Sequence, residues 1–155
     1  MKLLRVIVFD GSDARIFERA ALPDEWAVSG AFAFAHLSPE HLTGKTRQAF
    51  ANGFLGLPSL GRATFVSVGE ATAKDRASLL EALASHFVDE WGAPDRETAL
   101  EAAREEVQFA ADLAQGLANN TLLTVSRTFE DDGQIREAFR AIDARPDGEG
   151  QGEPV

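Results

Sequence analysis

Three histidines are the residues of this chain best suited to proton transfer or metal binding near neutral pH. His36 and His41 stand five positions apart, and His86 precedes Asp89 and Glu90 at helical spacing. The first two could face one another or a metal ion, but the spacing offers no third ligand. The third suits an ion pair on a helix surface. We therefore predict no metal site, and an acid–base role stays open for His36 or His41.

Other chemical motifs in the chain are incomplete. Gly44-Lys45-Thr46 resembles the end of a phosphate-binding P-loop, but Pro39 stands where that loop needs its first glycine. The glutamates between residues 97 and 106 are typical of a solvated helix face, because no histidine follows His86 to complete a carboxylate metal site. The absence of cysteine excludes a thiolate nucleophile, a disulfide and an iron–sulfur cluster. We expect no catalytic residue and no cofactor, and an enzymatic role is not favoured.

The most unusual segment is Gly53–Gly61, which follows neither a helical nor a strand period. It combines four large apolar side chains with three glycines and one proline, and basic residues stand on both sides of it. Such side chains must be buried somewhere, so the segment either closes the core or forms an apolar surface with a basic rim. Our functional hypothesis depends on the second alternative. The residues of this predicted surface are Lys45, Arg47, Phe50, Phe54, Leu55, Leu57 and Arg62.

The charge of the chain restricts its partners. The 155 residues carry 25 acidic and 15 basic side chains, which gives a net charge of −10. A surface this acidic repels phosphate backbones and anionic lipids, so we expect neither nucleic acid nor membrane as a partner. Residues 43–78 are the exception, with five basic and two acidic side chains. This basic excess coincides with the predicted surface.

Several apolar stretches predict the strands that would position this surface. Between Trp26 and His36, large side chains at even positions alternate with small ones at odd positions, which favours a strand. The predicted strands are Leu3–Phe9, Ala14–Arg19, Trp26–His36, Ala63–Val68 and Thr121–Phe129.

Helices are predicted mainly in the second half of the chain. Ala73–Trp91 and Asp95–Leu117 each carry an apolar stripe at helical spacing. A shorter helix is predicted over Lys45–Asn52, and a last amphipathic one over Ile135–Ile142. Ser38, followed by Pro39, suits the start of a further helix.

The order of these elements predicts an α+β fold. We expect a mainly antiparallel sheet of about five strands, packed against the two longer helices and a short C-terminal helix. Residues 1–145 would form a single domain, which suits 45% hydrophobic composition, and residues 146–155 a flexible acidic tail. No stretch approaches the roughly 18 apolar residues of a membrane span, and the first apolar run is too short for a signal peptide. We therefore expect a cytoplasmic protein.

Four stretches of the chain resemble a known family. They are Glu25–Ala33, Gln48–Phe50, Gly53–Gly56 and Gly61–Thr64. These residues resemble a family of small bacterial proteins with no assigned function, and the likeness extends over roughly Val6–Ile142. The resemblance implies a setting similar to that of accessory proteins of formate dehydrogenase and other molybdenum enzymes. It supplies no catalytic residues.

Two functions are consistent with these observations. The first is a non-catalytic accessory or interaction protein, whose apolar surface would bind a protein partner such as a redox enzyme or its assembly factor. The alternative is a small-molecule protein that uses the same region, either to bind an anionic ligand or for simple acid–base chemistry with His36 or His41. A homodimer formed through this surface is compatible with both.

Overall fold

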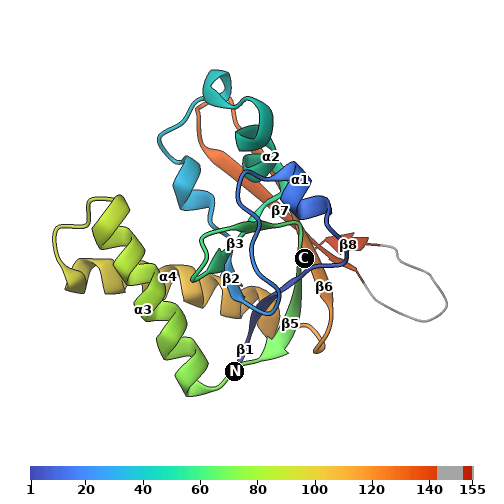
Figure 1. Cartoon of the computed structure of the whole chain (residues 1–155), viewed down its shortest axis with the longest axis vertical. Coiled ribbons are helices and arrows are strands. Elements are labelled where there is room, and N and C mark those ends of the chain that lie inside the picture. Colours follow the sequence, from blue (N-terminus) through green and yellow to red (C-terminus); the bar gives the residue numbers. More distant parts are fainter. Residues whose placement is uncertain (143–151, 155) are drawn as a thin grey trace.

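A computed structural model describes residues 1–142 and 152–154 of the chain (Figure 1). One antiparallel sheet runs through these residues in the strand order β4-β3-β2-β1-β5-β6-β7-β8. The α+β class and the antiparallel sheet are as predicted, but the sheet has eight strands instead of about five. The strands are β1 (Lys2–Ile7), β2 (Trp26–Val28), β3 (Phe54–Leu57), β4 (Arg62–Ala63), β5 (Phe65–Glu70), β6 (Leu122–Phe129), β7 (Ile135–Ile142) and β8 (Gly152–Pro154).

The central strand β1 was predicted from its apolar run. It pairs with β2 on one side and β5 on the other. Leu3 and Leu4 point to opposite faces and are both fully buried, so each face of the sheet is covered at this point. The expectation of a strand covered on both faces is confirmed.

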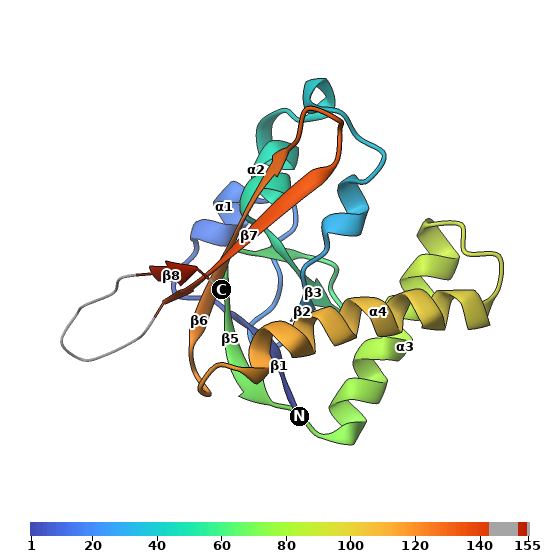
Figure 2. The ribbon, with the colours of Figure 1, turned by 180° about the vertical axis from the view of Figure 1, so that it is seen from behind.

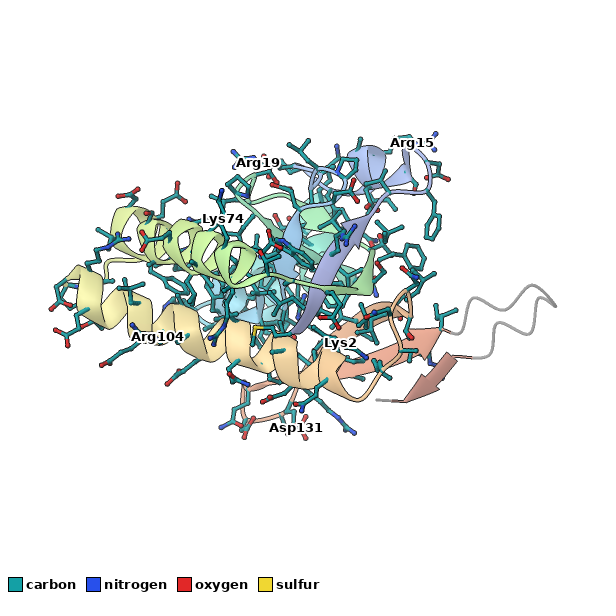
Figure 3. The ribbon with its side chains drawn as sticks, turned by 90° about the horizontal axis from the view of Figure 1, so that it is seen from below. Lys2, Arg15, Arg19, Lys74, Arg104 and Asp131 are labelled. Atoms are coloured by element: carbon teal, nitrogen blue, oxygen red, sulfur yellow. The ribbon has the colours of Figure 1, made fainter. Side chains whose placement is uncertain are left out.

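Helices lie beside the sheet and at one end of it (Figure 2). α4 packs against β1 and β2, α3 packs against α4 and β3, and α2 packs against β6. Figure 3 shows α3 and α4 side by side, with Lys74 and Arg104 on their outer surfaces. The α-helices are α1 (Ser12–Ile16), α2 (Gly44–Asn52), α3 (Ala73–Glu90) and α4 (Arg96–Gln115), and the 3-10 helices are η1 (Ala31–Phe34) and η2 (Pro39–His41).

Local sequence explains where the long helices begin and how they pack. Thr72 and Asp75 exchange side-chain and backbone hydrogen bonds in a capping box at the start of α3. Asp95 accepts a hydrogen bond from the Thr98 amide at the start of α4. The buried stripe of α4 consists of five alanines and Val107, whose small side chains let the helix approach the sheet closely.

Three of the predicted elements are wrong. Ala14–Arg19 is not a strand, because its first half, Ala14–Ile16, lies in α1. The strand predicted over Trp26–His36 ends at Val28, and Gly30, with φ of 79°, redirects the chain into η1. Phe32 and Phe34 both lie in η1 and pack in different directions, Phe32 against Phe87 and Phe34 against Phe50.

The predicted C-terminal helix is also wrong, because Ile135–Ile142 forms strand β7. All eight of its residues pair with β6, from Ile135 opposite Phe129 to Ile142 opposite Leu122. The spacing of its apolar residues is compatible with both a helix and a strand. The turn at residues 131–133 brings the segment back alongside β6, where it pairs as the second strand of a hairpin. The predicted flexible tail, residues 146–155, lies mostly outside the described residues, and within it Gly152–Pro154 pairs with β7.

The outer strand β4 is very short, and the segment before β2 covers it. Ala20 forms a parallel bridge with Arg62. The Arg62 amide donates to the Arg19 carbonyl at 2.8 Å, and the Ala21 amide donates to the Arg62 carbonyl at 2.9 Å. Among the described helices, none is both long and apolar enough to cross a membrane.

Candidate functional site

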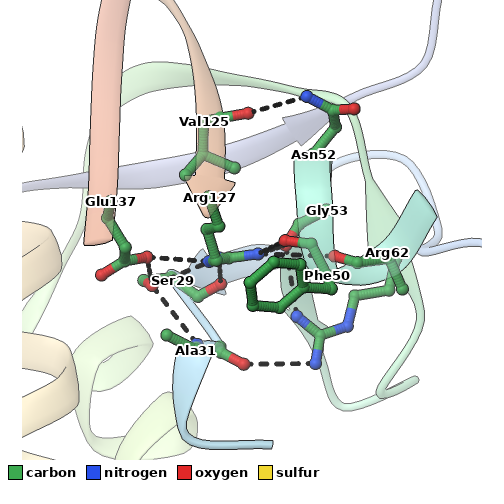
Figure 4. A network of polar contacts seen from close by, with 11 residues as sticks. Ser29, Ala31, Phe50, Asn52, Gly53, Arg62, Val125, Arg127 and Glu137 are labelled. Carbon is green, nitrogen blue, oxygen red and sulfur yellow. Dashed lines mark hydrogen bonds and ion pairs between the residues drawn. The ribbon is translucent and has the colours of Figure 1, made fainter. Parts of the chain in front are cut away.

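A buried arginine on β6 joins segments that are distant in the sheet (Figure 4). Arg127 is 3% exposed, and its Nη1 donates to the carbonyls of Phe50 and Gly53 at 3.0 and 2.8 Å. Its Nη2 donates to the carbonyl of Ser29, and its Nε to Glu137 on β7 at 2.9 Å. Because three strands separate β3 from β6 in the sheet, these contacts require a strongly curved sheet.

A second buried arginine lies next to the first. Arg62 on β4 donates to the carbonyls of Gly53 and Gly30, both at 3.2 Å, and its guanidinium lies 4.8 Å above the ring of Phe34. Burial, reinforced by the positive charge of Arg127, lowers the pKa of Arg62 to about 9. Within the described residues no carboxylate forms an ion pair with Arg62.

Glu137 is the ion-pair partner of Arg127. It accepts hydrogen bonds from Arg127 and from the Ser29 hydroxyl. Glu106 on α4 lines the same hollow of about 230 Å³ beside Ser29. Burial raises the pKa of Glu106 to about 7, and the negative charges of Glu137 and Glu105 add to the effect.

A cleft of about 420 Å³ opens beside Arg127, between η2, α2 and the end of β6. The rings of Phe50 and Phe129 stack in its wall, with centroids 4.6 Å apart. Arg47 lies exposed at its rim, and no ion pair within the described residues engages it. We call this the arginine cleft, and it is lined by Pro39, Leu42, Arg47, Phe50, Ala51, Arg127, Thr128 and Phe129.

The exposed apolar surface predicted around Gly53–Gly61 does not exist. Phe54, Leu55 and Leu57 form strand β3 and are 0%, 3% and 5% exposed. Phe50 and Arg62 are buried as well. The segment closes the core, which was the other alternative, because Gly56 lets β3 pack directly against neighbouring side chains.

Only part of the predicted residue set converges on one place. Arg47 and Phe50 line the arginine cleft, while Arg62 belongs to the buried network behind it. Leu57 lines a different cleft, and Lys45 is exposed on α2. The predicted residues therefore do not form one site: some line two different clefts, and others lie in the core or on the exposed surface.

The sequence reasoning missed Arg127 and its partner Glu137. A signal was present, because Leu123, Val125, Arg127 and Phe129 occupy alternate positions of one strand, and such positions share a face. An arginine within an otherwise apolar, inward-facing series indicates a buried and functionally constrained cation.

His36 and His86 both contact Trp91, whereas His41 caps η2. His41 accepts a hydrogen bond from the Ser38 amide at 3.2 Å, and His36 stacks on Trp91. His86 accepts a 2.7 Å hydrogen bond from the Trp91 indole, and burial lowers the pKa of His86. Within the described residues no group of three acidic or histidine side chains could hold a metal ion.

A model of a family of unknown function (DUF6505) matches residues 1–151. No curated protein and no solved structure matches the chain.

Proposed function

The chain belongs to the DUF6505 family, whose function is unknown, and we propose that it is a non-catalytic binding protein for an apolar molecule that carries an anionic group. The proposed site is the arginine cleft. One observation carries the proposal: buried Arg127, whose ion-pair partner is Glu137, lines this apolar cleft, and the buried Arg62 behind it forms no ion pair within the described residues.

Arg127 and Arg62 together carry two positive charges, and Glu137 supplies one negative charge within their network. Glu106, with a pKa of about 7, is only partly ionised at neutral pH and supplies a fraction of a second negative charge near Arg127. Charges in a desolvated environment interact more strongly than charges in water, so the excess positive charge favours an anion in the adjoining cleft. Arg47 at the rim adds a planar donor that can form two parallel hydrogen bonds to a carboxylate.

The apolar walls of the cleft favour an anion that also carries an apolar group. Leu42, Phe50 and Phe129 supply aliphatic and aromatic surface, and the volume falls in the range of small-molecule sites. A medium-chain or aromatic carboxylate combines both requirements.

Two other expectations stay predictions. Binding of a protein partner, such as a redox enzyme or its assembly factor, was based on exposure of Phe54 and Leu55, and their burial removes that basis. A homodimer through the same surface loses its basis for the same reason.

The test compares two ligands that differ only in charge. Calorimetric titration with octanoate should give a Kd about tenfold or more below that for 1-octanol, because a hydrogen bond to a charged group contributes about 1.5–3 kcal/mol. The variant Arg47→Gln should remove most of this preference, whereas Lys45→Gln on the same helix should keep it. Equal affinity for the two ligands, or an octanoate affinity indifferent to Arg47→Gln, would contradict the proposal.

A further inference from the structure

A second and larger cleft lies on different elements of the fold. It has a volume of about 540 Å³ and opens between the start of β2, the β3–β4 turn and α3. It shares no lining residue with the arginine cleft. We call it the tryptophan cleft, and it is lined by Leu22, Pro23, Asp24, Glu25, Trp26, Leu57, Pro58, Ser59, Ser78, Leu79 and Ala82.

The aromatic wall of the cleft is the Trp26 ring, and Arg5, which does not line the cleft, holds it in place. Trp26 pairs across strands with Leu57, and the guanidinium of Arg5 lies 5.2 Å from the centre of the indole ring. This cation–π contact covers part of the ring and restricts its rotation. The remaining indole surface is available to a ligand together with the apolar side chains of Leu79 and Ala82.

Another part of the wall is the β3–β4 turn, which Glu25 holds through hydrogen bonds. The Glu25 carboxylate accepts hydrogen bonds from the Ser59 amide at 2.7 Å, the Ser59 hydroxyl at 2.6 Å and the Leu22 amide at 2.8 Å. Gly61 packs so closely on Ala20 that a Cβ at this position would lie 2.3 Å from backbone atoms. The wall is therefore formed before any ligand arrives.

Two residues at or next to the cleft have a left-handed backbone conformation. Asp24 and Leu60 have φ of 68° and 65°, a conformation that residues other than glycine adopt rarely. Strained residues of this kind persist where the surrounding structure fixes them, and they cluster at ligand sites. Asp24 lines the tryptophan cleft, and Leu60 belongs to the turn that supplies Pro58 and Ser59.

The carboxylates at this cleft already have protein partners. Asp24 lies 3.8 Å from Arg5, and all three donors around Glu25 belong to the protein itself. An anionic ligand would lose its hydration beside the carboxylates of Asp24 and Glu25, with no basic side chain in the lining to pair with it, which is unfavourable. A neutral ligand loses little on entry and gains the apolar contacts.

We propose that the tryptophan cleft binds a neutral aromatic small molecule of about two fused rings, packed against Trp26. The volume lies within the range of known small-molecule sites, and aromatic pairs gain energy beyond that of burial alone. This site is independent of the function proposed for the arginine cleft.

The test uses the full chain labelled with 5-fluorotryptophan, in which the two tryptophans give two fluorine signals. The variant Trp91→Phe assigns them. Titration with 2-naphthalenemethanol should shift the Trp26 signal saturably and leave that of Trp91 in place. The matched anion 2-naphthoate should shift the Trp26 signal with a Kd about tenfold higher or more. Absence of a saturable Trp26 shift, or equal affinity for the anion, would overturn the proposal.

Two α3 variants locate the ligand. Ser78→Met places a larger side chain at the exposed margin of the tryptophan cleft and should raise the Kd for 2-naphthalenemethanol about tenfold. Ser85→Met, on an exposed part of the same helix outside the cleft, should leave the Kd unchanged. Arg47→Gln should also leave it unchanged. An unaltered Kd in Ser78→Met would place the ligand elsewhere and refute the assignment.

Discussion

The two clefts differ less in size than in the state of the charges behind them. The arginine cleft adjoins the buried guanidiniums of Arg127 and Arg62, of which only Arg127 forms an ion pair within the described residues, so an excess of positive charge lies behind its apolar walls. The tryptophan cleft adjoins carboxylates that the protein satisfies internally. Charge balance, more than volume, therefore determines which ligand each cleft can take. Removal of the polar contacts should therefore lower the free energy of unfolding by different amounts in the two regions.

The largest effect is expected at Arg127. Arg127→Met leaves Glu137 without its cation and several buried carbonyls without a donor, so the free energy of unfolding should fall by about 3–5 kcal/mol. Urea denaturation measures this loss. Arg136→Met, on the exposed face of β7, is the matched control and should change stability by less than about 0.5 kcal/mol. Similar losses in both variants would show that buried Arg127 contributes no more to stability than an exposed arginine.

A smaller effect is expected at the turn of the tryptophan cleft. Glu25→Gln replaces one acceptor oxygen by an amide nitrogen, which should lower the free energy of unfolding by about 1–3 kcal/mol. The same variant should weaken 2-naphthalenemethanol binding and leave octanoate binding intact. Glu18→Gln, exposed nearby, is the control. If Glu25→Gln weakened both ligands equally, the two clefts would not be independent.

The next expected effect is a pH dependence of stability that arises from Glu106, in the hollow beside Arg127 and Glu137. The pKa of Glu106 rises from 4.5 to about 7 on folding, so the folded chain binds more protons than the unfolded chain between these values. This group therefore makes the protein less stable as pH increases from about 4.5 through 7, and its cost is fully present above pH 7. Glu106→Gln should gain stability relative to wild type at pH 8 and not at pH 4, as measured by urea denaturation at both pH values. A pH-independent difference would contradict the raised pKa.

The smallest effect is expected at Lys45, which the sequence placed in the site. It is exposed on α2 and does not line either cleft. Lys45→Gln should change the free energy of unfolding by less than about 0.5 kcal/mol in urea denaturation and leave calorimetric affinities unchanged. A marked loss of octanoate affinity would show that the anion site extends along α2 beyond Arg47.

Long periodic segments of the fold were predictable, and short ones were not. The helices α3 and α4 show clear apolar stripes, and β1 and β6 are rich in branched side chains, so their type follows from local pattern. In β7 the apolar positions suit both periods, and pairing with β6 decides the outcome. Tertiary contacts likewise end β2 at Val28, where Gly30 lies against Arg62 and Leu55.

The candidate sites were predictable only in part for a related reason. Arg47 and Phe50 lie within one helix, and their neighbourhood is local. The contacts of Arg127 with Ser29 and Phe50 join residues 98 and 77 positions apart, which no local pattern indicates. Leu57 and Trp26 meet only through the register of β2 and β3. The apolar character of Gly53–Gly61 is evident from the sequence. Its burial is not, because burial results from the pairing of β3 with β2 and β4.

The cover over β4 has a consequence for self-association. Exposed strand edges offer unpaired amides and carbonyls on which another chain can add a strand and begin aggregation. At Arg62 both of these groups are already bonded to residues 19 and 21. A second molecule could extend the sheet there only by first displacing that segment, so the protein is protected against polymerisation from this edge.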